Sequence, residues 1–199
     1  QADKTAKVLV VSVELCTIHF QKEATIDNFI SSAIFSDGAG ALLIEGEQSS
    51  YPRAFVLTDF YCDLLPEGKQ EMTWDIGNFG FDIKLSSYVP DLIGNGIATF
   101  YQRLLSRKTL SNVDYYAIHP GGKKILEACE TALNISSLDN RFSYEVLKNY
   151  GNMSSATIIF VLKKLWETLT VSDHHKKLFC CAFGPGLTLE SMMLTVNYA

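Results

Sequence analysis

One strand-to-helix turn, IHPGGKK, carries the first residues able to do chemistry. His119 ends an apolar strand pattern there, and strand ends of this kind carry the sites of many α/β folds. Its imidazole can serve as acid, base or hydrogen-bond donor near neutral pH, or it can satisfy nearby backbone groups. Gly121 and Gly122 open the next helix, and Lys123 and Lys124 follow. Together these four residues can hold an anion such as a phosphate, with solvated lysines as the alternative.

Asn152, in the stretch YGNMSSA, is the second candidate. Its amide can cap the helix that follows, or it can act as a donor aimed at an anionic oxygen. The neighbouring residues Gly151, Ser154, Ser155 and Ala156 are small enough to let a ligand approach. Four larger apolar side chains can line a pocket or belong to the core: Phe35, Trp74, Ile83 and Met153.

The other histidine and cysteine spacings predict no metal site. His174 and His175 lie in a charged turn without a third ligand at a suitable spacing. The five cysteines are odd in number and form no CxxC pair, so they indicate reduced, mostly buried thiols in a cytosolic setting. Cys180 and Cys181 are consecutive on a predicted strand and therefore pack on opposite faces. Asp37, in SDGAG, is typical of a turn.

The composition excludes several classes of function. With 199 residues, 47% hydrophobic and 20% charged, the chain can form one folded domain with a sizeable core. A net charge of −5 without a basic block argues against a nucleic-acid partner. The longest apolar runs, 8–13 and 156–162, fall short of the about 18 residues that a membrane span needs. The polar start at Gln1 has no secretory pattern and looks cut from something longer; we expect a cytoplasmic location.

Alternating strand and helix patterns must position the candidate residues. Strands are predicted at 7–13, 54–61, 81–85, 113–119 and on both sides of a Gly-Pro-Gly loop at 184–186. The first of these, KVLVVSV, is expected to be buried on both faces. Helices are predicted from Pro90 and at 123–133, 143–149 and 153–169, whereas 63–78 is expected to be loop. This order indicates an α/β layered fold with a mixed sheet.

Several stretches resemble one family in order and spacing. VDYYAIHPGGKKIL, LKNYGNMSSAT and FGPGLTLE are similar to the C-terminal half of the chalcone and stilbene synthases, the type III polyketide synthases. KVLVVSVE and AIFSDGAGALLI resemble the segments that follow the nucleophile of that family. The resemblance implies a thiolase-like αβαβα fold, in which residues 1–50 end the N-terminal half and 51–199 form the C-terminal half. The polar stretch at 46–53 marks the boundary.

The same resemblance implies a homodimer that condenses malonyl-CoA onto an acyl-CoA starter, with CoA thioesters as substrates and no further cofactor. Cysteine, histidine and asparagine carry that reaction, and by motif His119 and Asn152 take the second and third roles. His119 would hold the nucleophilic thiol as a thiolate by pairing with it as an imidazolium. Both side chains would then donate hydrogen bonds to the thioester oxygen and stabilise the enolate left when malonyl-CoA loses CO₂.

Other positions are carried over from the same motifs. Phe35 matches a gatekeeper at the junction of the CoA tunnel and Ile83 a second gatekeeper, while a bulky Trp74 would shrink the cavity. Further implied substrate contacts are His19, Ser36, Asp37 and Ser154. The implied CoA contacts are Gly121, Gly122, Lys123 and Lys124.

The chain departs from the family in one respect. None of its cysteines falls in the nucleophile motif, and Cys16 stands where relatives often carry threonine. We therefore expect a fragment that is inactive alone and leaves an apolar face exposed. Two alternatives stay open: a ketoacyl-carrier-protein synthase III-like condensing enzyme, or a non-catalytic thiolase-fold module for dimerisation or binding.

Overall fold

A four-stranded mixed sheet forms the centre of the computed structural model, which describes residues 3–46, 51–78, 80–107 and 113–198. Its strand order is β3-β8-β7-β6, with β6 parallel to β7 and the other neighbours antiparallel. The strands of this sheet are β3 (Arg53–Leu64), β6 (Tyr115–Ile118), β7 (Lys177–Gly184) and β8 (Thr188–Tyr198). The expected domain boundary at 46–53 contains 47–50, which lie outside the described residues.

Two antiparallel pairs of strands stand outside the central sheet. They are β1 (Lys7–Glu14) with β2 (Gly38–Glu45), and β4 (Met72–Gly77) with β5 (Gly80–Leu85). Five α-helices are described: α1 (Ile26–Ile34), α2 (Val89–Ser106), α3 (Lys123–Leu133), α4 (Arg141–Tyr150) and α5 (Thr157–Thr168). Four short 3₁₀ turns are described: η1 (Cys16–His19), η2 (Pro66–Gly68), η3 (Ser154–Ala156) and η4 (Val171–Asp173).

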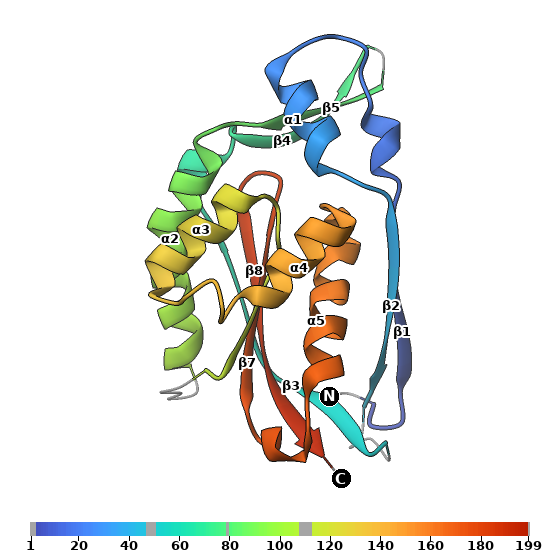
Figure 1. Cartoon of the computed structure of the whole chain (residues 1–199), viewed down its shortest axis with the longest axis vertical. Helices are drawn as coiled ribbons and strands as arrows, with labels where there is room; N and C mark the ends of the chain where they lie inside the picture. Colours follow the sequence, from blue (N-terminus) through green and yellow to red (C-terminus); the bar gives the residue numbers. More distant parts are fainter. Residues whose placement is uncertain (1–2, 47–50, 79, 108–112, 199) are drawn as a thin grey trace.

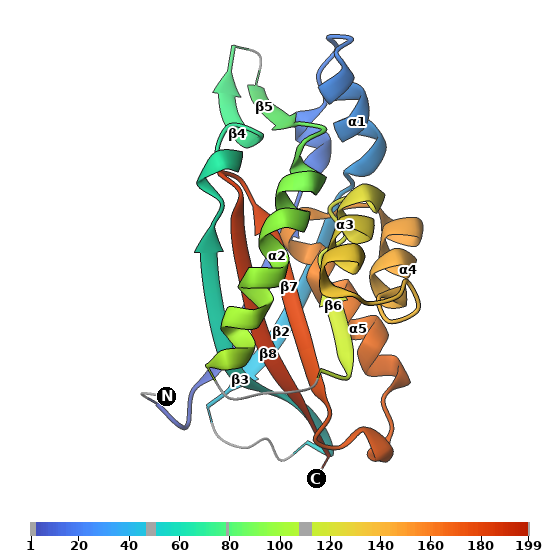
Figure 2. The same cartoon turned by 90° about the vertical axis from the view of Figure 1, so that its left-hand side faces the viewer.

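The elements stack in layers. Helices α2 and α3 cover one face of the central sheet, while α5 with α4 covers the other (Figure 1). The β1–β2 pair lies on the far side of α5, so that strands and helices alternate through the molecule (Figures 1 and 2). The predicted layered α/β fold with a mixed sheet is confirmed.

Apolar spacing explains the helices and the central strands. In α2 the side chains of Ile93, Ile97 and Leu104 are fully buried, which matches one face of a 3.6-residue period. Cys180 and Cys181 are buried in separate clusters on the two faces of the sheet, as the alternation of a strand requires. Within the described part of the chain, no helix has the length and apolar character needed to span a bilayer.

Two elements, β4 and α1, were not predicted from the sequence. Residues 63–78 were expected to be loop, but Met72–Gly77 forms β4, because pairing with β5 outweighs the surrounding turn signals. The polar segment ahead of residue 35 contains α1, whose first turn is capped where the Thr25 hydroxyl accepts a hydrogen bond from the Asn28 N–H at 3.2 Å.

The expected burial of β1 on both faces is wrong. Val8, Leu9, Val11 and Val13 are each more than 50% exposed, although their residue types suit a core strand. The reason is that, among the described residues, β1 pairs only with β2, and α5 with η3 covers one side of that pair. The expected exposed apolar face is therefore confirmed.

A buried carboxylate fixes the loop that leads into β7. The charged turn at 172–177 contains Asp173, which is only 6% exposed. It accepts hydrogen bonds from Tyr115 Oη at 2.6 Å, Lys176 Nζ at 2.7 Å and the Thr170 backbone N–H at 2.7 Å. Burial alone would raise the pKa of Asp173, but these hydrogen bonds outweigh it and hold the pKa well below its ordinary value.

Asp173→Asn is expected to lower the free energy of unfolding at pH 7 by about 2 kcal/mol, because hydrogen bonds to a charged acceptor are lost. The unfolded state takes up its proton near pH 3.8, whereas the folded state does so only at lower pH. The wild-type advantage is therefore present above pH 4 and declines as the pH falls below it. Urea unfolding at pH 7 and pH 3 measures both effects. The exposed control Asp75→Asn should change stability by less than about 0.5 kcal/mol, and equal losses in the two variants would contradict the assignment.

Candidate active site

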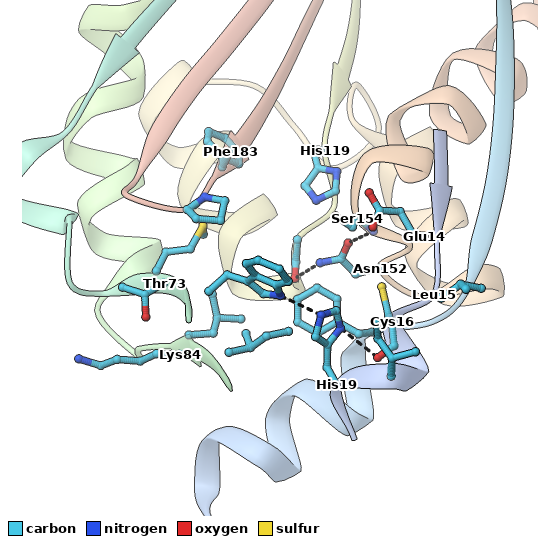
Figure 3. A pocket seen from close by; sticks show the side chains of 18 of the residues that line it. Glu14, Leu15, Cys16, His19, Thr73, Lys84, His119, Asn152, Ser154 and Phe183 are labelled. Atoms are coloured by element: carbon cyan, nitrogen blue, oxygen red, sulfur yellow. Dashed lines mark hydrogen bonds between the residues drawn. The ribbon is translucent and has the colours of Figure 1, made fainter. Parts of the chain in front are cut away.

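A mostly apolar cavity of about 540 Å³ lies where β6 and β7 end, between η1 and the β4–β5 hairpin (Figure 3). Its lining comes from the end of β1 with η1, from the residue after α1 and from the β4–β5 hairpin. The rest comes from the end of β7, the start of α3 and the turns that follow β6, β7 and α4. Eight of the predicted site residues line it: His19, Phe35, Trp74, Ile83, His119, Gly121, Asn152 and Ser154.

His119 follows the last residue of β6 and faces this cavity. Its backbone N–H donates to the Cys181 carbonyl at 2.8 Å, which continues the pairing with β7 and fixes the ring at the sheet edge. The residue is 8% exposed, and its ring nitrogens have no hydrogen-bond partner among the described residues. Burial lowers the pKa of His119 to about 4, so the ring is neutral at pH 7. An unpartnered neutral imidazole in a cavity is available for a ligand.

Asn152 reaches the same cavity from the turn between α4 and η3. Its Oδ1 accepts from the N–H of Ser154, the first residue of η3, at 2.9 Å, while the N-cap positions of η3 and α5 are Met153 and Ala156. Its Nδ2 donates to the Gly121 carbonyl at 3.3 Å. Because that amide carries two hydrogens, one remains for a ligand.

Gly121 brings the imidazole and the carboxamide together. Its carbonyl holds Asn152, and a Cβ atom at this position would lie 3.9 Å from His119 Nε2. His119 and Asn152 both line the cavity, and Figure 3 labels them among its side chains. The two proposed donors therefore share one space.

Asn152 is itself fixed by a distant segment of backbone. Its N–H donates to the Ile34 carbonyl at 2.8 Å, and its carbonyl accepts from the Ser36 N–H at 2.9 Å. These bonds form a parallel bridge between Phe35 and Asn152, which brings Phe35 to the cavity as well.

The remaining predicted residues do not line the cavity. Asp37 accepts hydrogen bonds from the Thr17 N–H at 2.8 Å and the Thr17 hydroxyl at 2.9 Å, so it holds η1 and does not form the predicted local turn, because β2 begins at the next residue. The Ser36 hydroxyl donates to the Tyr150 carbonyl. Gly122 is the buried N-cap of α3, and Lys123 and Lys124 are exposed at its start, with Lys123 3.3 Å from Glu127.

Sequence reasoning missed several cavity residues, notably Glu14, Cys16, Met72 and Phe183. Glu14 accepts a hydrogen bond from the Ser155 N–H at 3.2 Å and another from the Ser155 hydroxyl, so its carboxylate joins the end of β1 to η3. The sequence offers one signal for Glu14, which is that a carboxylate directly follows the apolar pattern of β1.

The cysteines of the central sheet and cavity are not activated nucleophiles. Burial raises the pKa of the Cys16 thiol, and the carboxylates of Glu14 and Asp37 raise it further. Burial raises the pKa of Cys180 to about 12 and the pKa of Cys181 well above its ordinary value. The described clusters of His, Cys, Asp and Glu include no group of three placed to bind a metal ion.

Known proteins share both the sequence and the layered fold. A family model described as "Chalcone and stilbene synthases, C-terminal domain" matches residues 57–197. A putative chalcone synthase of Bacillus subtilis is 33% identical over 96% of this chain and 54% of its own length. The chain spans about half the length of this relative.

Two solved structures superimpose closely. The C-terminal type III polyketide synthase domain of Steely1 from Dictyostelium has a TM-score of 0.89 and 30% identity, covering 100% of this chain and 56% of its own. The 1,3,6,8-tetrahydroxynaphthalene synthase of Streptomyces coelicolor has a TM-score of 0.91 and 26% identity over the same shares.

These superpositions show that the chain has the layered α/β fold of the thiolase-like condensing enzymes. Within that class it belongs to the chalcone and stilbene synthase family and contains the C-terminal domain of that family.

The neutral state of His119 is open to direct measurement. We expect its imidazole resonances in an NMR pH titration to change near pH 4, whereas an ordinary histidine titrates near 6.5. Because the unfolded state binds this proton at higher pH than the folded state, stability should fall by up to about 3 kcal/mol between pH 6.5 and 4. His119→Phe should abolish this fall in stability between pH 6.5 and 4, whereas the same substitution at the exposed His175 should leave it in place. A His119 transition near 6.5 would refute the assignment.

Proposed function

We propose that this chain is the catalytic C-terminal part of a type III polyketide synthase, which joins malonyl-CoA to an acyl-CoA starter with loss of CO₂. The observation that carries the proposal is the pair formed by His119 and Asn152, two buried side chains with hydrogens left to donate, in one mostly apolar cavity. Membership of the chalcone and stilbene synthase family supports the same reaction.

The chemistry demands stabilisation of one negative oxygen. When the carboxylate of malonyl-CoA leaves as CO₂, the electron pair of the broken C–C bond becomes an enolate whose charge lies on the thioester oxygen. In the proposal, a neutral His119 N–H and the second N–H of Asn152 donate to that oxygen. Such donors are worth most in a cavity that excludes water, because a low dielectric strengthens them. The enolate carbon then attacks the starter thioester, and the thiolate that held the starter leaves.

A nucleophilic thiol from outside this chain completes the scheme. The buried cysteines described here have raised pKa values, so they favour the unreactive thiol form. His119 is neutral in the empty cavity, but a thiolate placed beside it would raise its pKa by charge attraction and favour the imidazolium. A charge-assisted pair of this kind is our proposal for the role of His119 before the starter binds.

The CoA moiety is proposed to lie toward α3. Gly121 lines the cavity and precedes the helix start, and the ammonium groups of Lys123 and Lys124 are exposed beside it. Cations and a helix N-terminus at one place favour a phosphate. A homodimer, a cytoplasmic location and independence of any further cofactor complete the proposal.

The test uses a complete synthase, in which this chain is joined to the part of the Bacillus relative that it does not cover. His119→Ala and Asn152→Ala are each expected to lower the rate of malonyl-CoA decarboxylation about 10²–10³-fold, because one donor to the enolate is lost. Release of CO₂ from labelled malonyl-CoA measures the rate.

Matched controls separate chemistry from folding. His175→Ala and Asn149→Ala make the same chemical changes at exposed positions and should leave the rate unchanged. Circular dichroism confirms that each variant is folded. Wild-type rates in folded His119→Ala or Asn152→Ala would refute the assigned roles and favour a non-catalytic binding module.

A further inference from the structure

Three aromatic rings form one wall of the cavity at η1 and the β4–β5 hairpin. The indole of Trp74 stacks on Phe81 with ring centroids 4.4 Å apart and 16° between the ring planes. His19 packs edge-on against both, with centroid distances of 6.0 Å to Trp74 and 5.8 Å to Phe81. His19 and Trp74 line the cavity, and Trp74 remains 46% exposed, so its ring can contact a ligand.

The polar atoms of this wall are already paired with each other. Trp74 Nε1 donates to His19 Nε2 at 2.8 Å, and His19 Nδ1 lies 3.2 Å from the Cys16 carbonyl. An indole has one donor, and a neutral imidazole has one donor and one acceptor. Since Nε2 accepts from Trp74, the hydrogen of His19 must lie on Nδ1, where it reaches the Cys16 carbonyl. Neither side chain keeps a strong donor or acceptor for a ligand.

The neighbouring lining adds little polarity. Ile18, Phe35 and Ile83 are apolar, and the Glu14 carboxylate is held by Ser155. Thr73 and Lys84 also line the cavity, but in Figure 3 their side chains extend away from His119 and Asn152. A hydroxyl group placed against the His19–Trp74 wall would therefore lose its water and gain no partner.

We propose that the hydrogen-bonded pair of His19 and Trp74 determines specificity, and selects an aliphatic acyl group over the same group with a hydroxyl at its distal end. The inference rests on the proposed function, because it concerns the acyl group that the cavity accepts. An apolar pocket discriminates against an added hydroxyl by about a hundredfold, since desolvation of the hydroxyl is uncompensated.

The experiment compares octanoyl-CoA with ω-hydroxyoctanoyl-CoA as starters for the complete synthase. The wild type should prefer octanoyl-CoA by about a hundredfold in kcat/KM. Trp74→Phe keeps an aromatic ring on Phe81 but removes the N–H, so His19 Nε2 becomes a free acceptor. The preference should then fall to about tenfold or less, because the hydroxyl gains a partner. Trp166→Phe makes the same change at a residue packed on Arg53 and Phe55, away from the cavity, and should keep the preference.

A second variant approaches the pair from the other side. His19→Leu frees the Trp74 N–H as a donor and should also reduce the preference, whether or not Trp74→Phe is stable enough to assay. An unchanged preference in a folded variant at either position, or a wild type with no preference, would overturn the inference. Starter-independent decarboxylation of malonyl-CoA is measured in parallel. Loss of decarboxylation in His119→Ala tests the proposed function. A changed starter preference with intact decarboxylation in His19→Leu or Trp74→Phe supports the specificity role separately.

Discussion

The site depends on two backbone hydrogen bonds between Asn152 and residues 34 and 36, which join segments more than a hundred residues apart in the sequence. This bridge brings Phe35 to the cavity and fixes the turn that presents the Asn152 amide. The close approach also requires a small residue nearby, because a Cβ atom on Gly38 would lie 2.7 Å from the Cβ of Met153. A side chain at position 38 would push β2 away from η3 and loosen the bridge.

The apolar character of the cavity explains its electrostatics. Desolvation lowers the pKa of His119 and raises the pKa of Cys16, so both groups are uncharged at neutral pH. Two uncharged groups in a mostly apolar cavity do not compete with a charge that develops during a reaction, and fixed donors act strongly on such a charge where water is excluded. In the two proposals above, the same exclusion of water makes a distal hydroxyl costly to bind, so the proposed reactivity and the proposed selectivity have one physical origin.

Sequence patterns predict correctly those helices and strands that interactions between neighbouring residues determine. The sequence predicts α3 with its observed bounds, the start of α2 to within one residue and the β7–β8 hairpin, because apolar periodicity and Gly-Pro-Gly suffice there. The strand β4 was missed because it exists through pairing with β5, and the burial of β1 was wrong because burial depends on neighbours. In the cavity, His119 and Asn152 follow recognisable turns. The hydrogen bond from Trp74 to His19 joins positions 55 residues apart, and no spacing rule predicts it.

Residues from two parts of the chain line the cavity, and their proposed roles differ. His119 and Asn152, which are assigned to the chemistry, lie within the matched domain at 57–197, whereas Cys16, His19 and Phe35 precede it. Trp74 belongs to the matched domain but finds its hydrogen-bond partner in the earlier segment. A substitution in η1 can therefore reshape the wall that we propose to bind the acyl group without moving the imidazole at the end of β6, because a different element holds each of them. Under the proposed function, this separation is a physical route by which starter preference changes while the decarboxylation chemistry is retained.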